Sequence, residues 1–206
     1  MTTSHCHLNM GVCWDKFALL ERYPFSRDGC KLIKDGSKGS SFLFEYKFAM
    51  TMDFKLLIIL DLDNTLIYGS YAPSEMAELL FRYNDYVKVY ERPLARELVE
   101  LCGRTGDVIV YTSALRDYAR GICSRLNIKP KELLSRKHCR LYKGRYYKTI
   151  REEWLDADRI IIIDDSPDIW KMVDNDKITM LVPDEFRGQA DDVGLKMVIE
   201  RLLYLQ

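Results

Sequence analysis

The sequence predicts an α/β protein built on a doubly wound parallel sheet, with helices on both faces. Two observations support this prediction. Continuous apolar runs alternate with segments of helical periodicity from residue 54 to the C-terminus. Polar side chains, most of them carboxylates, directly follow three of these apolar runs. Strands of a parallel sheet that are buried on both faces are apolar throughout, and their carboxyl ends form one edge. We therefore expect the functional site at that edge.

The strands and helices alternate in the order that such a sheet requires. The predicted strands are Leu56–Leu60, Val108–Tyr111, Ile160–Ile163 and Ile178–Val182. One helix begins after Pro93, a favoured first helical residue, and covers residues 94–102. A second covers residues 115–126, where apolar residues recur at helical spacing, and a third closes the chain at residues 198–205.

Composition limits the classes of protein that remain. Lys+Arg and Asp+Glu are both 31, so no net charge attracts the chain to nucleic acid or to acidic lipid. No apolar run reaches the roughly 18 residues of a membrane helix, and the N-terminus lacks the layout of a signal peptide. The six cysteines are therefore expected to be reduced thiols. These observations predict an intracellular protein, cytoplasmic or nuclear, with no membrane partner.

Two segments are expected: an N-terminal extension (1–52), loosely ordered, and a folded domain (53–206). The stretch Lys34–Ser41 is rich in Gly and Ser, as linkers are. Three cysteines and two histidines in the extension leave zinc open as an alternative, although their spacing lacks the paired Cys-x2-Cys of structural zinc sites. Met50 and Met52 also leave an internal translation start open.

Polar residues are expected to converge where three strands end. They are Asp61, Asp63 and Thr65 after the first strand, Thr112 and Ser113 after the second, and Asp164 and Asp165 after the third. Each segment alone could be an ordinary turn or helix cap. Together, however, the carboxylates would repel one another unless they are paired or bind a cation. Oxygen ligands without His or Cys favour Mg²⁺, so the edge is predicted to hold magnesium.

The order of these residues along the chain separates two known kinds of carboxylate site. In a response-regulator receiver the acidic pair follows the first strand. Here a DxDxT segment comes first, then hydroxyl residues, then Lys148, and the acidic pair comes last. This is the order of the haloacid dehalogenase superfamily, whose phosphatases use an aspartate as nucleophile.

Residues from about Phe54 to the C-terminus resemble one family of that superfamily. It comprises the phosphatases of the RNA polymerase II C-terminal domain (CTD), including the small CTD phosphatases and the nuclear LIM interactor-interacting factors. The matching segments are Asp61–Leu66, Tyr90–Pro93, Val110–Ala114 followed by Tyr118–Ala119, Gly144–Lys148 and Ile163–Pro167. There are two departures: Asn64 stands where Glu is usual, and Asp165 stands where the small members usually have Asn.

The resemblance and the charges of the site together imply a mechanism. A phosphate dianion repels a carboxylate nucleophile unless a cation bridges the two. Asp61 is expected to attack phosphorus and form an aspartyl-phosphate, while Asp63 transfers the proton. The expected Mg²⁺ ligands are Asp61, Asp165 and Asp63, the last through its backbone carbonyl, as the family implies.

The remaining site residues are expected to bind phosphate or to support the loops. Thr112, Ser113 and Lys148 are the predicted phosphate-binding residues. Thr65 is expected to support the DxDxT loop, and Asp164 to orient Lys148 or a metal-bound water. For Lys148 the alternative is a solvated lysine, because residues 136–148 contain six Lys or Arg and three Tyr. This basic stretch could instead bind nucleic acid, attract an acidic phosphopeptide, or form a solvated hairpin that turns at Lys143-Gly144.

Loop lengths predict a large substrate. Only 46 residues separate Thr65 from Thr112, enough for a small flap or hairpin around Tyr86–Val89 but not for a cap domain. An open site suits a phosphoserine or phosphothreonine protein, with a CTD-like chain as one candidate partner. A phosphatase for nucleotides or polynucleotide 3′ ends, and a non-catalytic scaffold of the same fold, are the alternatives. Nucleic acid is not the favoured partner.

Overall fold

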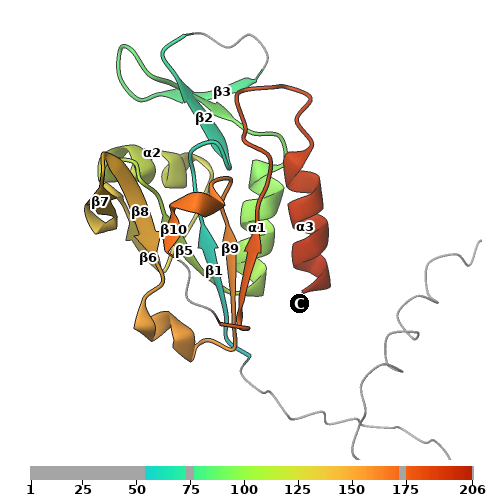
Figure 1. Ribbon diagram of the computed structural model, residues 1–206. Coiled ribbons are helices and arrows are strands. Elements are labelled where there is room, and N and C mark those ends of the chain that lie inside the picture. The colour runs from blue at the N-terminus through green and yellow to red at the C-terminus, as the bar shows by residue number, and fades with distance from the viewer. Residues whose placement is uncertain (1–53, 73–76, 172–174, 206) are drawn as a thin grey trace, which may run out of the picture. The chain divides into compact units, whose positions relative to one another are not determined.

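The computed structural model describes residues 54–72, 77–171 and 175–205, and it contains a five-stranded parallel sheet (Figure 1). The strands lie in the order β11-β9-β1-β5-β6. Their bounds are β1 (Leu56–Leu60), β5 (Asp107–Tyr111), β6 (Glu132–Leu134), β9 (Arg159–Ile163) and β11 (Ile178–Leu181). All four predicted strands are confirmed, and β6 is an addition. The expected domain boundary, the linker and the zinc alternative lie outside the described residues.

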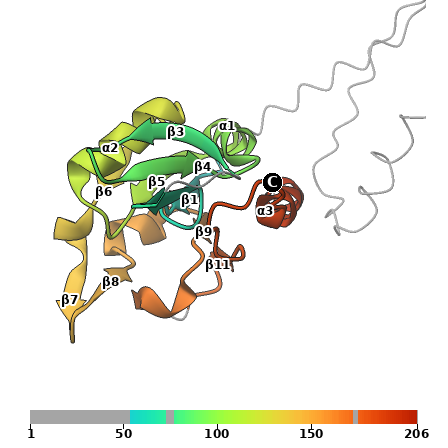
Figure 2. The same cartoon turned by 90° about the horizontal axis from the view of Figure 1, so that it is seen from above.

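Alternate residues of each central strand face opposite sides of the sheet, and each side has its own core. On one side Ile58 and Leu60 pack with the three α-helices of the described residues. These are α1 (Ala95–Thr105), α2 (Arg116–Arg125) and α3 (Gly194–Tyr204), which confirm the three predicted helices. Figure 2 shows α1 and α3 next to each other on this side. None of the helices in the described part of the chain is long and apolar enough to cross a membrane.

The second face of the sheet differs in part from the expected layer of helices. Leu57 and Ile59 pack there with residues of the 3-10 helix η2 (Glu152–Asp156) and of a small sheet. The order in the small sheet is β10-β8-β7, with bounds β7 (Arg140–Tyr142), β8 (Arg145–Thr149) and β10 (Trp170–Lys171). The reason is that the connection from β6 to β9 contains the basic stretch, which lacks helical periodicity and folds as a hairpin. Lys143 and Gly144 form its turn, as predicted, with φ of 47° and 78°.

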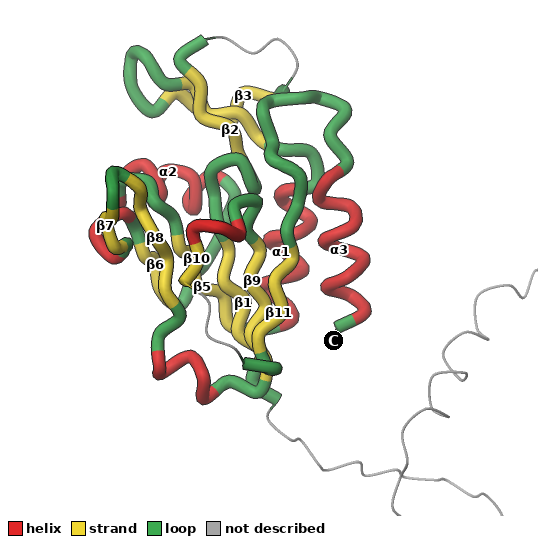
Figure 3. The backbone as a smooth tube through the Cα atoms, viewed as in Figure 1, coloured by secondary structure: helices red, strands yellow, loops and turns green. Residues whose placement is uncertain are grey.

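The predicted flap is a three-stranded antiparallel sheet with the order β2-β4-β3. Its strands are β2 (Ile67–Ser70), β3 (Glu78–Arg82) and β4 (Lys88–Glu91). The loops that follow β1 and β9 lie between the main sheet and this flap (Figure 3). Two further 3-10 helices, η1 (Arg136–His138) and η3 (Pro167–Ile169), flank the same edge. The described residues therefore show a small flap at the carboxyl edge, in the place where a cap domain would be inserted.

Candidate active site

Asp61, Lys148 and Asp164 form a buried ion-paired group at the carboxyl end of the sheet. The backbone N–H of Asp61 donates to the Ile163 carbonyl at 3.0 Å, so the β1–β9 pairing continues to the first residue of the loop. Lys148 Nζ donates to Asp61 Oδ1 at 2.5 Å and to Asp164 Oδ2 at 2.6 Å. Lys148 is 1% exposed, so the alternative of a solvated lysine is wrong.

The charge of Lys148 is maintained by its carboxylate partners. Burial alone lowers the pKa of a lysine, but the facing carboxylates of Asp61 and Asp164 raise the pKa of Lys148 above its ordinary value. Asp164 also accepts the indole N–H of Trp170 at 2.8 Å and the backbone N–H of Ser166 at 2.9 Å. The lysine is thus a fixed cation beside Asp61, and Asp164 is in a position to orient it.

Asp63 has a different environment although only one residue separates it from Asp61. The Tyr118 hydroxyl donates to Asp63 Oδ1 at 2.9 Å, and the Thr112 hydroxyl approaches Oδ2 at 3.4 Å. Burial raises the pKa of Asp63, and the hydrogen bond from Tyr118 partly opposes this shift. A carboxyl group with a raised pKa is suited to carry a proton in one step and to release it in another.

The flap reaches the same residues through a close backbone approach. A Cβ atom at Gly69 in β2 would lie 2.6 Å from the Tyr118 hydroxyl and 3.9 Å from Asp63 Oδ1. A larger residue at position 69 would displace the Tyr118 hydroxyl that donates to Asp63, so glycine suits β2 at this position. The ring of Tyr83, which follows β3, packs edge-on against Tyr118 with centroids 5.0 Å apart.

Two hydrogen bonds connect the loop after β1 with the loop after β9. Thr65 Oγ1 donates to Asp165 Oδ1 at 2.9 Å and accepts the backbone N–H of Asp165 at 3.1 Å. This arrangement agrees with the expected supporting role of Thr65. Asn64, next to it, has a φ of 62°, a conformation that Asn tolerates better than most residues.

Arg92 is a further positioning residue that sequence reasoning treated only as part of a motif. It is 0% exposed and pairs with Asp192, with Nε–Oδ1 at 2.6 Å and Nη2–Oδ2 at 3.0 Å. Its Nη1 donates to the Thr65 carbonyl at 3.0 Å, and its Nη2 donates to the Asp184 carbonyl at 2.8 Å. Arg92 thus ties the DxDxT loop to the segment before α3.

The structure brings together three carboxylates that fit a magnesium ion. One oxygen each of Asp61, Asp164 and Asp165 lies within 4.8 Å of the others. Counting Asp63, four carboxylates lie at this edge, and Lys148 forms ion pairs with two of them. Among the described residues of the edge, negative charge is therefore in excess. A donor set of oxygens alone suits Mg²⁺. The Asp63 side chain is not in this group, and the family resemblance implies that Asp63 would bind the metal through its backbone carbonyl.

The two predicted hydroxyl residues lie at the same edge. Thr112 Oγ1 accepts the backbone N–H of Ala114 at 3.0 Å, which leaves its hydroxyl hydrogen available toward Asp63 or a phosphate. Ser113 is half-buried, and its carbonyl accepts from Arg136 Nε at 2.7 Å. Tyr118 was noted for its helical spacing and as part of a segment that matches the family, but its contact with Asp63 was not predicted.

The fold is an α/β sheet with an acidic carboxyl edge and the buried Lys148. A site of carboxylates and a lysine in such a fold is of the kind that binds phosphate groups. Comparison with protein families then gives a definite placement. The chain belongs to the NLI interacting factor-like phosphatase family, whose sequence model matches residues 56–206. This confirms the predicted family.

Curated relatives match a shorter segment. The chain is 27% identical over 120 residues to the human carboxy-terminal domain RNA polymerase II polypeptide A small phosphatase 1, a match that covers 55% of this chain and 46% of the relative. It is 30% identical over 120 residues to phosphatase PSR1 of Saccharomyces cerevisiae, covering 55% and 28%. The chain therefore matches less than half the length of either relative. Among solved structures, that of Fcp1, an essential RNA polymerase II CTD phosphatase, aligns with a TM-score of 0.47 and 20% identity, covering 74% of this chain and 49% of that one.

Proposed function

We propose that this chain is a Mg²⁺-dependent phosphatase that hydrolyses phosphoserine and phosphothreonine in proteins through an aspartyl-phosphate on Asp61. The observation that carries the proposal is the pair of unlike carboxylates at one sheet edge. Asp61 lies 2.5 Å from the buried Lys148 cation, while Asp63 accepts a hydrogen bond from the Tyr118 hydroxyl at 2.9 Å. This difference in environment suits Asp61 for attack on phosphorus and Asp63 for proton transfer.

In the first half-reaction an Asp61 oxygen attacks phosphorus and the bond from phosphorus to the serine or threonine oxygen breaks. Asp63 gives its proton to that leaving oxygen. Lys148 and Thr112 interact with the phosphoryl oxygens, where negative charge is spread in the transition state. In the second half-reaction Asp63 takes a proton from water, the water oxygen attacks phosphorus, and Asp61 is regenerated as phosphate leaves.

The metal ligands would be Asp61, Asp165 and the backbone carbonyl of Asp63. When bound, Mg²⁺ would supply positive charge that offsets the repulsion between the phosphate dianion and the carboxylates. Asp164 is already engaged by Lys148, Trp170 and Ser166. We therefore assign Asp164 to the orientation of Lys148, and Asp165 to the metal.

A protein substrate is favoured by the small size of the flap. The described residues at the carboxyl edge form a three-stranded sheet, and an open site gives a small ester few contacts. A phosphorylated chain can add flanking contacts that raise the rate. The human relative is named as an RNA polymerase II CTD phosphatase, and a CTD-like Ser-Pro repeat is accordingly our candidate substrate.

A turnover panel tests this function. The full chain with Mg²⁺ is given an aryl phosphate, phosphoserine peptides with Ser-Pro repeats, nucleoside monophosphates and a 3′-phosphorylated oligonucleotide. We expect hydrolysis of the aryl phosphate, and kcat/KM highest on the peptides. Faster hydrolysis of a nucleotide or of the oligonucleotide than of every peptide would replace the protein-phosphatase proposal. No turnover of any compound would favour the non-catalytic scaffold.

We extend the proposal to the catalytic domain and its compartment. All the site residues lie in 53–206, so a chain that begins at Met52 should keep its kcat/KM within about twofold; an insoluble or inactive product would contradict this.

Cys102, Cys123 and Cys139 are free thiols, in keeping with an intracellular protein. Recovery of the protein only from the culture medium, in fractionated cells, would argue against that compartment.

A further inference from the structure

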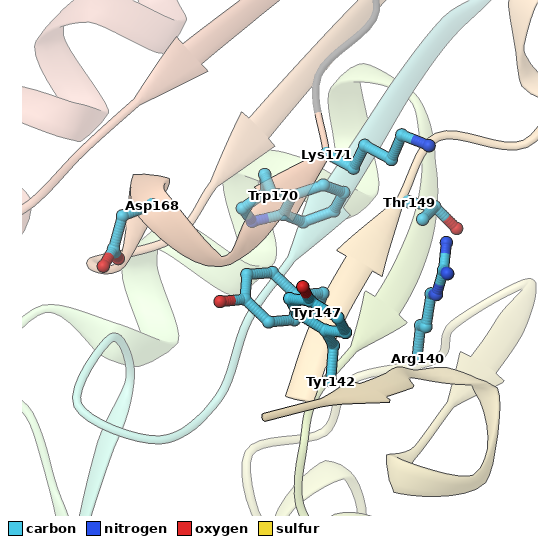
Figure 4. Close-up of a pocket in the computed structure, with 7 residues that line it drawn as sticks. All are labelled: Arg140, Tyr142, Tyr147, Thr149, Asp168, Trp170 and Lys171. Carbon is cyan, nitrogen blue, oxygen red and sulfur yellow. The ribbon is translucent and has the colours of Figure 1, made fainter. Parts of the chain in front are cut away.

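A cavity of about 510 Å³ lies on the small sheet, beside the catalytic centre. Its lining includes Tyr142, Tyr147, Trp170, Arg140, Lys171 and Asp168. Figure 4 shows the three aromatic side chains converging, with Arg140 and Lys171 on one side of them and Asp168 on the other. The cavity thus combines aromatic walls with cationic side chains, a composition that is typical of recognition surfaces.

The cavity and the catalytic centre lie on opposite sides of the same strand. Successive side chains of a strand point to opposite faces, so Tyr147 points away from the face that carries Lys148. Trp170 belongs to both places. It lines the cavity, it is the register partner of Lys148 in the pairing of β8 with β10, and its indole N–H donates to Asp164 Oδ2 at 2.8 Å. Trp170 therefore connects the cavity to the Lys148–Asp164 pair.

The charges around the cavity favour an acidic ligand. Arg145 Nη2 pairs with Asp168 Oδ2 at 2.6 Å, which offsets the one carboxylate of the lining. Arg140 and Lys171 are exposed, and no described carboxylate forms an ion pair with either. Two cations that have no ion-pair partner among the described residues thus line the cavity, where they can attract negative charge.

The arrangement of the rings favours a proline rather than a nucleobase. Tyr142 and Tyr147 meet at an interplanar angle of 61° with centroids 6.4 Å apart. A base is held best between near-parallel faces, and these two rings already contact each other at a steep angle. An angled aromatic corner instead accommodates the compact ring of proline in an extended peptide.

We propose that this cavity binds an acidic, proline-containing segment that flanks the phosphorylated residue of the substrate. The proposal rests on the proposed phosphatase function for the identity of the chain that carries this segment. Asp168, on η3, lies three residues after Asp165, so the cavity begins next to the catalytic loop. Two strand spacings of about 5 Å each separate β10 from β7. A flank of about three residues, ~10 Å when extended, spans that path.

Binding of an unphosphorylated peptide tests the cavity without using the catalytic centre. The probe is a fluorescently labelled acidic peptide with repeated prolines, measured by anisotropy against the full chain. We expect Arg140→Glu and Tyr142→Ala to weaken its binding about tenfold each. The matched controls are Lys196→Glu and Tyr204→Ala on α3, which are also exposed and lie away from the small sheet. Circular dichroism confirms that each variant is folded.

Kinetics then link the cavity to substrate selection. For the wild type, kcat/KM on a phosphopeptide with long flanks should exceed that on a short phosphopeptide by about tenfold, and the ratio should approach one in Arg140→Glu and Tyr142→Ala. Absence of wild-type binding, or equal binding by all variants, would overturn the proposal. A labelled single-stranded oligonucleotide that loses affinity in these variants while the peptide does not would identify a nucleic-acid site instead. If no compound is turned over but the peptide binds as expected, the phosphatase function fails while the acidic-peptide site stands.

Discussion

The two sides of the catalytic edge differ in what holds their carboxylates. On the nucleophile side, Asp61 and Asp164 share the ammonium group of Lys148, at 2.5 and 2.6 Å. On the proton-transfer side, Asp63 is held by the hydroxyl groups of Tyr118 and Thr112. Burial raises the pKa of both aspartates. At Asp61 this shift is opposed chiefly by the Lys148 cation, and at Asp63 chiefly by the hydrogen bond from the neutral Tyr118 hydroxyl.

The two sides also come from different parts of the chain. Lys148 projects from the small sheet, which covers one face of the main sheet. Tyr118 projects from α2 on the other face, where Tyr83 and Gly69 of the flap region pack against it. Two aspartates separated by a single residue can therefore have different environments, because each is contacted by a different layer of the fold.

The largest effect is expected from Asp61→Asn. The amide keeps the size of the side chain but cannot attack phosphorus, so kcat on an aryl phosphate should fall by about a thousandfold or more. The control is Asp176→Asn, an exposed residue in the turn before β11, at the amino end of the sheet and so opposite the site. A folded Asp61→Asn protein that retains a tenth of wild-type turnover would remove Asp61 from the nucleophile role.

Metal removal should distinguish the roles of Asp164 and Asp165, in the loop after β9. EDTA should abolish turnover and Mg²⁺ restore it, because the excess carboxylates repel phosphate. Asp165→Ala should raise the Mg²⁺ concentration for half-maximal activity by about tenfold or more, and Asp164→Ala should do so less while lowering kcat. Titration of activity with Mg²⁺ measures both. Equal shifts in the two variants would mean that Asp164 is also a direct ligand.

The free energy of unfolding tests the role of the Lys148 cation. Lys148→Met leaves two buried carboxylates without their cation, so the free energy of unfolding should fall by about 3–5 kcal/mol. Urea denaturation in EDTA measures this without compensation by metal. Lys131→Met is the matched control: its ion pair with Asp107 has both side chains more than half exposed, and should be worth no more than about 1 kcal/mol. Similar losses in both variants would contradict the special role of the buried pair.

The smallest effect is expected on the proton-transfer side. Tyr118→Phe keeps the ring that packs against Tyr83 but removes the hydrogen bond to Asp63. We expect kcat to fall about tenfold with little change in KM for a short phosphopeptide. Tyr204→Phe, on an exposed side chain, serves as control. An unchanged kcat would show that Asp63 needs no support from Tyr118, and a change in KM alone would mean that Tyr118 contacts substrate.

Some parts of the fold could be predicted from the sequence and others could not. Leu56–Leu60 was identified because a strand buried on both faces has no polar residues, and Asp61 was found because it ends that strand. The flap was predicted only as a hairpin, since β3 is mostly exposed and lacks a clear pattern. The layer opposite the helices was missed because a hairpin of mixed exposure carries no strong signal of what it covers.

The site residues likewise include some that could be predicted from the sequence and some that could not. The carboxylates were predicted because a charge at the end of a buried strand requires a partner or a cation. The role of Lys148 was predicted through the family resemblance. The roles of Tyr118 and Arg92 were not predicted. Helical periodicity places the Tyr118 ring in the core but does not say which group its hydroxyl meets. The partners of Arg92 lie 27 and 100 residues away in the chain, so only the folded structure brings them together.

The covalent step is tested most directly by trapping the enzyme during turnover. The full chain is mixed with Mg²⁺ and a phosphoserine peptide, quenched in acid within the first turnovers, digested, and analysed by mass spectrometry. We expect the mass of one phosphoryl group on the peptide that contains Asp61, in a fraction that disappears when hydroxylamine is added. A phosphoryl group found on any other residue, or steady turnover with no phosphorylated enzyme at any quench time, would contradict the assignment of Asp61 as nucleophile.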